Sequence, residues 1–64
     1  MFVQIIKGDG KKMTRECGGA DVNVDGDHAV ITIQPEGHEV RMLKAGTKVF
    51  LVNNEGRTID SYRW

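Results

Sequence analysis

Glycine and proline recur along this chain at intervals so short that no apolar segment extends for more than a few residues. The turn-forming segments are Gly8-Asp9-Gly10, Gly18-Gly19, Asp25-Gly26-Asp27, Pro35-Glu36-Gly37, Ala45-Gly46 and Asn53-Asn54-Glu55-Gly56. Gly, Asn and Asp tolerate positive φ angles and Pro presets φ, so each segment favours a change of chain direction. An α-helix of the usual length, about 10–14 residues, has little room between them.

The segments between the turns have the composition of β-strands. Phe2–Ile6, Ala29–Ile33 and Val49–Val52 are rich in β-branched and aromatic residues, which favour extended conformations. An Asp-Gly pair between two such segments, as at Asp25-Gly26, is a strong hairpin signal. The sequence predicts strands at residues 2–7, 11–16, 20–24, 29–34, 38–43 and 48–53, with a further strand at 57–63. A helical turn over 39–45 is the alternative for one of them.

Short turns make consecutive strands antiparallel neighbours, and a strand-rich chain of this length must curl or close to cover its edges. We therefore expect an all-β fold with little or no helix. In this fold a small antiparallel meander closes into a barrel or a two-sheet sandwich of the SH3-like or OB-like size class. That comparison concerns size and class and implies no function. Residues 1–64 are expected to form a single small β domain.

Side-chain alternation predicts which residues face the core. Residues that share one face are Ala29, Ile31 and Ile33, then Val22 and Val24, and then Val40 and Met42. The strands expected at 2–7, 29–34 and 48–53 are apolar on both faces, and such strands are usually covered on both sides. A chain of 64 residues can hardly do this alone, and its only cysteine, Cys17, forms no disulfide within the chain. We therefore expect self-association into a homo-oligomer.

The net charge is zero, but the charges are segregated along the chain. Residues 16–39 contain acidic side chains and no Lys or Arg, whereas residues 1–15 and 40–64 each carry an excess of positive charge. A neutral total gives no general affinity for nucleic acid. The favoured interpretation is that oppositely charged strands lie side by side in a sheet and pair. The alternative is an acidic face that steers a partner.

One segment matches the first half of a calcium-binding loop. The residues from Asp21 to Asp27 follow the pattern D-x-[DN]-x-[DN]-G, which brings oxygen ligands around a cation. The twelfth position, where a bidentate Glu closes such a loop, is Thr32. A half-buried strand that ends in an Asp-Gly turn explains the same residues. Calcium binding through Asp21–Asp27 is therefore kept as the third functional hypothesis, and we expect no metal and no cofactor.

The sequence offers little for catalysis. Cys17 would need a base, and His28 and His38 are each expected beside a turn, where a histidine is usually solvated. No pair of carboxylates and no catalytic triad has a suitable spacing, so we expect a protein without enzymatic activity. The lone thiol is typical of a reducing compartment, and no segment approaches the length of a membrane span, about 20 apolar residues. These features predict a cytoplasmic protein that does not bind membranes.

The final residues are the most informative about partners. The sequence ends in Tyr62-Arg63-Trp64, and these residue types are enriched at binding hot spots. The alternative is that Trp64 lies in the core of a last strand. The leading hypothesis is a non-enzymatic protein-interaction module that self-associates, a small adaptor or inhibitor of the kind that phages and mobile elements encode. Its expected partner-binding residues are Tyr62, Arg63, Trp64, Asp25 and Asp27.

The second hypothesis is an OB-like or SH3-like protein that binds nucleic acid. Basic residues flank the first predicted hairpin at Lys7, Lys11, Lys12 and Arg15. Binding to single strands also requires exposed aromatic side chains on the same surface. The chain has only Phe2, Phe50, Tyr62 and Trp64 as aromatic residues, and a small core needs most of them. Nucleic-acid binding is therefore not favoured over protein binding.

Overall fold

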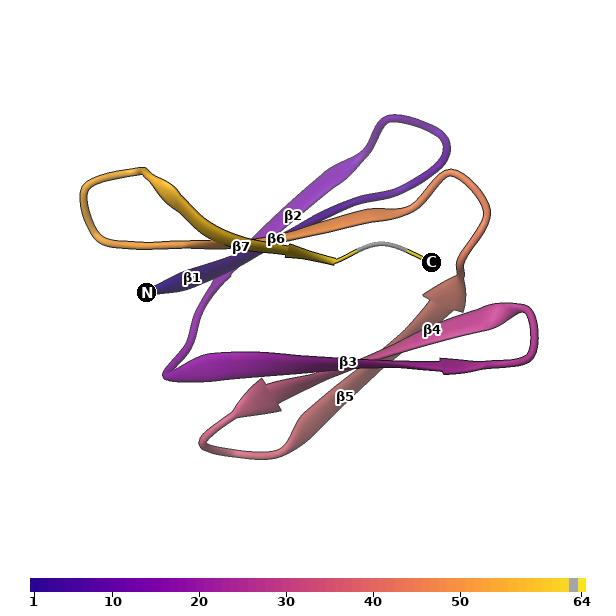
Figure 1. Ribbon diagram of the computed structural model, residues 1–64, viewed down its shortest axis with the longest axis horizontal. Coiled ribbons are helices and arrows are strands. Elements are labelled where there is room, and N and C mark those ends of the chain that lie inside the picture. The colour runs from indigo at the N-terminus through magenta and orange to yellow at the C-terminus, as the bar shows by residue number, and fades with distance from the viewer. Residues whose placement is uncertain (63) are drawn as a thin grey trace.

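The computed structural model describes residues 1–62 and 64, which form two antiparallel β-sheets packed face to face (Figure 1). The strands are β1 (Phe2–Ile6), β2 (Lys12–Glu16), β3 (Gly19–Asp25), β4 (His28–Gln34), β5 (His38–Leu43), β6 (Lys48–Val52) and β7 (Thr58–Tyr62). The described residues contain no helix, so none of them could cross a membrane in helical form. The predicted strand positions are confirmed with small differences at their ends, and a strand replaces the helical turn considered for 39–45.

The order of strands departs from a simple meander. The three-stranded sheet has the order β3-β4-β5, in which consecutive strands pair as predicted. The four-stranded sheet has the order β2-β1-β6-β7, so β1 pairs with β6 and joins two hairpins from opposite ends of the chain. The described strands do not close into a barrel, and the two-sheet alternative describes the fold.

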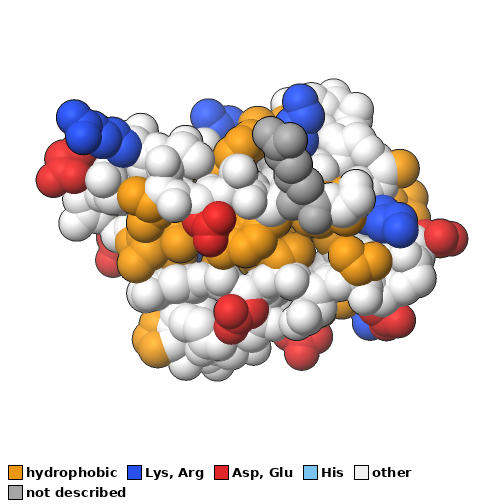
Figure 2. All heavy atoms as spheres, viewed as in Figure 1, with side chains coloured by type: hydrophobic (Ala, Val, Ile, Leu, Met, Phe, Trp, Pro, Cys, Tyr) orange, Lys and Arg blue, Asp and Glu red, His pale blue; other side chains and the backbone are white. Residues whose placement is uncertain are grey.

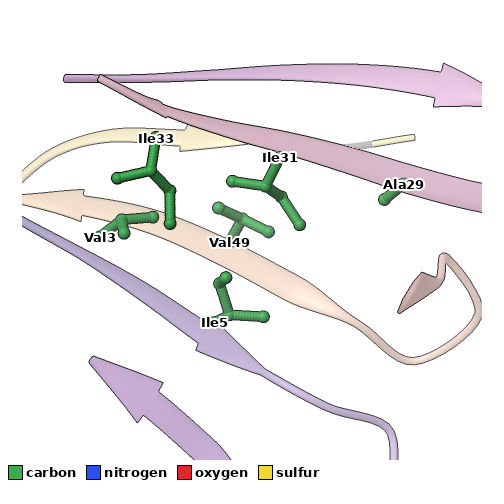
Figure 3. Close-up of a cluster of buried hydrophobic side chains, with 6 residues drawn as sticks. All are labelled: Val3, Ile5, Ala29, Ile31, Ile33 and Val49. Carbon is green, nitrogen blue, oxygen red and sulfur yellow. The ribbon is translucent and has the colours of Figure 1, made fainter. Parts of the chain in front are cut away.

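The core lies between the inner faces of the two sheets (Figure 3). Its buried cluster consists of Val3, Ile5, Ala29, Ile31, Ile33 and Val49. The predicted inner face of β4 is thereby confirmed, because its alternate residues are the buried ones. Val22, Val40 and Met42 pack against the margin of the cluster as expected. Val24 remains 50% exposed, since it lies near the end of a strand at the edge of its sheet.

Two glycines meet where the turn after β1 approaches the connection between β5 and β6. Gly46 has a φ of 75°, and a Cβ atom at this position would lie 3.0 Å from the Cα of Gly8. Both the backbone conformation and the lack of space therefore require glycine at position 46. Gly10, in the same β1–β2 turn, has a φ of 89° but no atom within 4 Å of such a Cβ.

The comparison of these two glycines gives a test of this contact. We expect Gly10→Ala to lower the free energy of unfolding by about 1–2 kcal/mol, the usual cost of the left-handed conformation. Gly46→Ala should lower the free energy of unfolding by about 1–3 kcal/mol more than Gly10→Ala does, because the added methyl group overpacks the backbone of Gly8. Urea unfolding followed by circular dichroism measures both values. Equal losses in the two variants would show that the turns do not touch in solution.

Candidate functional site

A groove of about 800 Å³ lies between the free edges of β3 and β7, which belong to different sheets. Its apolar lining consists of Met1, Ala20, Val22, Leu51, Ile59 and Tyr62. Figure 2 shows hydrophobic side chains in a band that crosses this face between the two sheets, with acidic side chains on both sides of it. The groove exists because the sheets meet here through two edge strands that have no strand between them.

Tyr62 crosses the groove from β7 to β3. Its hydroxyl donates a hydrogen bond of 2.9 Å to the carbonyl oxygen of Ala20. Burial raises the pKa of Tyr62 above its ordinary value of 10.0, and the negative charges of Asp60 and Asp21 raise it further, with a smaller effect from Cys17. The tyrosine therefore holds the two edges together in its neutral form.

The rim of the groove is acidic. Asp21 lines it from β3 and Asp60 lines it from β7, while no Lys or Arg among the described residues does so. The Asp21 carboxylate accepts a long hydrogen bond of 3.4 Å from the Gln34 amide, and the Asp60 carboxylate accepts one of 2.9 Å from the N–H of Ser61. Both carboxylates belong to exposed residues. The groove thus combines apolar side chains with a polar lining of similar extent, which includes Asn23, Thr32 and Gln34 and in which Asp21 and Asp60 are the charged side chains.

The predicted partner-binding residues fall into two places. Tyr62 lies in the groove, whereas Asp27 and Trp64 meet at one end of the sandwich through Lys44. The Trp64 indole N–H donates to the carbonyl of Lys44 at 2.7 Å, and the Lys44 N–H donates to the carbonyl of Asp27 at 2.9 Å. Trp64 is 39% exposed and lies outside the buried core. Arg63 lies outside the described residues.

Asp25, the remaining predicted partner residue, stands beside Asp27 at the hairpin between β3 and β4. Its carboxylate accepts hydrogen bonds of 3.1 and 2.8 Å from the guanidinium of Arg41 on β5. Pairing of Asp25 with His28 across a two-residue turn confirms the hairpin predicted from the Asp-Gly pair. Both acids at this tip are exposed, but the carboxylate of Asp25 is paired with Arg41.

The charge blocks of the sequence follow the two sheets. The acidic block, residues 16–39, supplies Glu16 at the end of β2, all of β3 and β4, and the start of β5, whereas residues 1–15 and 40–64 supply the rest of the four-stranded sheet and the end of β5. The prediction that oppositely charged strands pair within one sheet is therefore wrong, apart from the contact of Arg41 with Asp25. Pairing of β1 with β6 is the reason, because it joins the two basic blocks to each other.

The four basic residues of the first hairpin are divided between its two faces. Lys7 and Lys11 lie at the turn, and Lys12 and Arg15 point to opposite faces of β2 because side chains alternate along a strand. Lys12 belongs to the outer face of the four-stranded sheet. On that face the register places Lys12, Ile6 and Lys48 in one row across three strands.

An aromatic hollow adjoins that row. Phe50, Lys48 and Trp64 line it together, which places two aromatic side chains beside a lysine on this part of the sheet. Sequence reasoning missed Lys48 and Phe50, although their alternate positions in β6 put them on one face. The missing information was the pairing of β6 with β1, which has no local signal in the sequence.

The segment that resembles a calcium loop is an extended strand. Asp21, Asn23 and Asp25 lie at alternate positions of β3, so neighbouring side chains are about 7 Å apart along the strand. Oxygen atoms with this spacing do not converge on one ion. Within residues 1–62 and 64, no group of three or more His, Cys, Asp or Glu is placed to hold a metal. Cys17, in turn, packs against the margin of the core.

The raised pKa of Tyr62 leads to a prediction about stability at alkaline pH. Because the folded protein holds this proton more tightly than the unfolded chain, its contribution is complete below pH 10.0 and is lost as the pH rises through the higher folded value. We expect the unfolding free energy of the wild type to fall more steeply above this pH than that of Tyr62→Phe. Urea titrations of both proteins measure the difference.

Tyr62 is the only tyrosine, so phenolate absorbance reports its ionisation directly. Replacing Asp60 with Asn removes a negative charge and keeps an acceptor for the Ser61 N–H, and should therefore lower the pKa of Tyr62. An unchanged titration curve in Asp60→Asn would contradict the negative potential assigned to the groove.

Comparisons with protein-family models, with curated proteins and with solved structures found no match for this chain. Function must therefore be inferred from the surfaces themselves. These are the acidic-rimmed groove between β3 and β7 and the basic, aromatic outer face of the four-stranded sheet. The two surfaces adjoin at Tyr62, but Ile59 lines the groove and not the hollow, and Lys48 and Phe50 line the hollow and not the groove, so substitutions can address each one separately.

Proposed function

We propose that this chain is a non-enzymatic protein-interaction module that holds a segment of a partner protein in the groove between β3 and β7. The observation that carries this proposal is the group of apolar side chains, with the exposed Ile59 among them, that lines the groove together with two acidic side chains. Exposed apolar side chains that are grouped rather than scattered singly mark a candidate site of interaction. Specific protein interfaces have the same arrangement, with an apolar centre and a polar rim.

The groove also indicates the chemistry of its partner. A side chain that covers Val22, Leu51 and Ile59 removes apolar surface from water, which contributes about 25 cal/mol for each Å² buried. Asp21 and Asp60 on the rim favour positive charge on either side of that side chain. The preferred partner segment is therefore apolar with flanking Lys or Arg. The free thiol of Cys17 is consistent with our proposal that the module works in the reducing environment of the cytoplasm.

A pair of designed peptides tests the proposal. We expect a nine-residue peptide of alternating Leu and Lys to bind and a peptide of alternating Leu and Glu to bind at least ten times more weakly. Ile59→Ser should weaken binding of the first peptide about tenfold, which corresponds to about 1.4 kcal/mol. Fluorescence anisotropy of the labelled peptides measures the affinities, and amide chemical shifts locate the site.

The chain offers a matched control for this experiment. Leu43 is 62% exposed and Ile59 is 53% exposed, but Leu43 lies at the end of β5 and does not line the groove. Leu43→Ser should therefore leave peptide affinity unchanged. Equal weakening by the two substitutions, or shifts confined to residues outside the groove, would overturn the proposal.

A second candidate function, binding of single-stranded nucleic acid, is supported by the outer face of the four-stranded sheet. Phe50 and Trp64 share one hollow with Lys48, and Lys12 extends the positive charge across the sheet. Stacking of bases on aromatic side chains and contacts from lysines to phosphates are the elements of such sites. The neutral net charge of the chain makes this candidate the weaker of the two.

Titration with a fluorescent oligothymidine at low salt tests the second candidate. If this face binds nucleic acid, Lys48→Gln and Phe50→Leu should each weaken binding several-fold, and the affinity should fall steeply as salt is added. Ile59→Ser serves as the control, because it alters the groove alone. An affinity that does not depend on salt, or that Ile59→Ser reduces as much as Phe50→Leu, would eliminate this candidate.

A further inference from the structure

The strand β2 presents a free edge to solvent. It stands at the end of the four-stranded sheet and pairs with β1 alone among the described strands. All its residues except Met13 are exposed. Unpaired N–H and C=O groups on such an edge are a template for another strand. The direction of these groups and the charges beside them determine what kind of strand fits.

Hydrogen bonds at both ends of the hairpin define which main-chain groups face outward. The Lys7 N–H donates to the carbonyl of Lys11 at 2.8 Å, and the Cys17 N–H donates to the carbonyl of Met1 at 2.8 Å. In an antiparallel pair, residues that point toward the neighbouring strand alternate with residues that point away. The main-chain N–H and C=O groups of the odd-numbered residues of β2 therefore point toward β1. The residues whose N–H and C=O groups face the open edge are Lys12, Thr14 and Glu16.

The sequence of β2 is complementary to itself about its central residue. If a second copy pairs in antiparallel orientation with the twofold axis at Thr14, Lys12 lies opposite Glu16 of the second copy. Glu16 then lies opposite the Lys12 of that copy, and the two Thr14 residues face each other. All three pairs are of the type that exchanges two main-chain hydrogen bonds. Opposite charges in directly facing positions add about 0.2–1 kcal/mol per pair.

These charges have no partner of their own within the described chain. Lys12 and Glu16 are four residues apart on one strand, which separates them by about 13 Å. The ion pair that the described residues form joins Arg41 to Asp25. A second copy of β2 therefore satisfies both charged side chains and all the outward main-chain groups in one register.

Each of the other edge strands has one group near its open edge that is already bound within the molecule. On β7, the Ser61 N–H is bound by the carboxylate of Asp60. On β3, the carbonyl of Ala20 accepts the Tyr62 hydroxyl, and the neighbouring outward side chains are acidic or neutral. On β5, the guanidinium of Arg41 is held by Asp25. The charges of Glu39 and Arg41 on β5 are also complementary about Val40, but Arg41 is already paired with Asp25. Among the four edges, β2 alone has a self-complementary charge pattern whose side chains form no ion pair within the described residues.

We propose that two copies of this chain associate through their β2 edges, in antiparallel register about Thr14, and thereby join their four-stranded sheets into one continuous sheet. The strand β7 lies at the opposite end of the sheet order, and none of Lys12, Thr14 and Glu16 lines the groove, which therefore stays open in this dimer. The dimer and the proposed function of the groove are therefore independent.

Charge exchange provides the test. Lys12→Glu places Glu opposite Glu at two positions of the dimer, and Glu16→Lys places Lys opposite Lys. We expect each single variant to dimerise at least ten times more weakly than the wild type in sedimentation equilibrium at low salt. An equimolar mixture of the two variants restores opposite charges at both positions and should form a mixed dimer. The double variant Lys12→Glu/Glu16→Lys should dimerise like the wild type.

Two further variants separate this register from general effects of charge. Arg15→Glu makes the same change in charge as Lys12→Glu, but it faces Met13 of the second copy and should alter the dimerisation constant less than threefold. Thr14→Pro removes an outward N–H without touching the ladder to β1 and should abolish the dimer. Circular dichroism confirms that each variant is folded.

The proposal is overturned if the wild type stays monomeric at millimolar concentration, or if the mixture of charge variants does not associate. It is also overturned if Arg15→Glu weakens the dimer as much as Lys12→Glu. The Leu-Lys peptide should bind to the groove of every folded variant with wild-type affinity. Loss of dimerisation with peptide binding retained, or the converse, therefore identifies which of the two proposals has failed.

Discussion

The contact between the inner face of β4 and the inner faces of β1 and β6 is the interaction on which the rest of the structure depends. A small aliphatic cluster from these three strands holds the sheets together. Four strands lie against three, and residues 1–62 and 64 provide no further element to cover the margins. The groove and the free strand edges are direct consequences of this arrangement. The groove and the β2 edge, on which our proposals rest, are therefore both places where the sandwich is incomplete.

The sequence predicted the strands well because their signals are local. Turn residues mark the ends of each strand, and alternation identified Ala29, Ile31 and Ile33 as the buried face of β4. Pairing of β1 with β6 was not predicted, since strands far apart in the chain carry no mark of their partner. This single pairing joins the basic blocks and places Lys48 beside Lys12 in the same row.

The candidate sites were harder to predict because each depends on segments that are distant in sequence. Tyr62 was recognised as a candidate from its residue type, but its position opposite Ala20 required the packing of the two sheets. Val22 was expected in the core and lies instead between core and groove. Self-association was expected from strands that are apolar on both faces. Self-association stays a prediction, and the dimer that we propose rests on a different feature, the charge pattern along the edge of β2.

The sheet order β2-β1-β6-β7 has a geometric consequence for any pair of molecules joined at β2. Strands in a sheet are spaced about 4.8 Å apart, so the two β7 strands of such a pair would stand roughly 34 Å from each other. A ligand that carries two binding segments at this separation would engage both molecules, and its second contact would benefit from a high effective concentration. Such a dimer would then bind ligands that carry two segments at this separation more tightly than ligands that carry one.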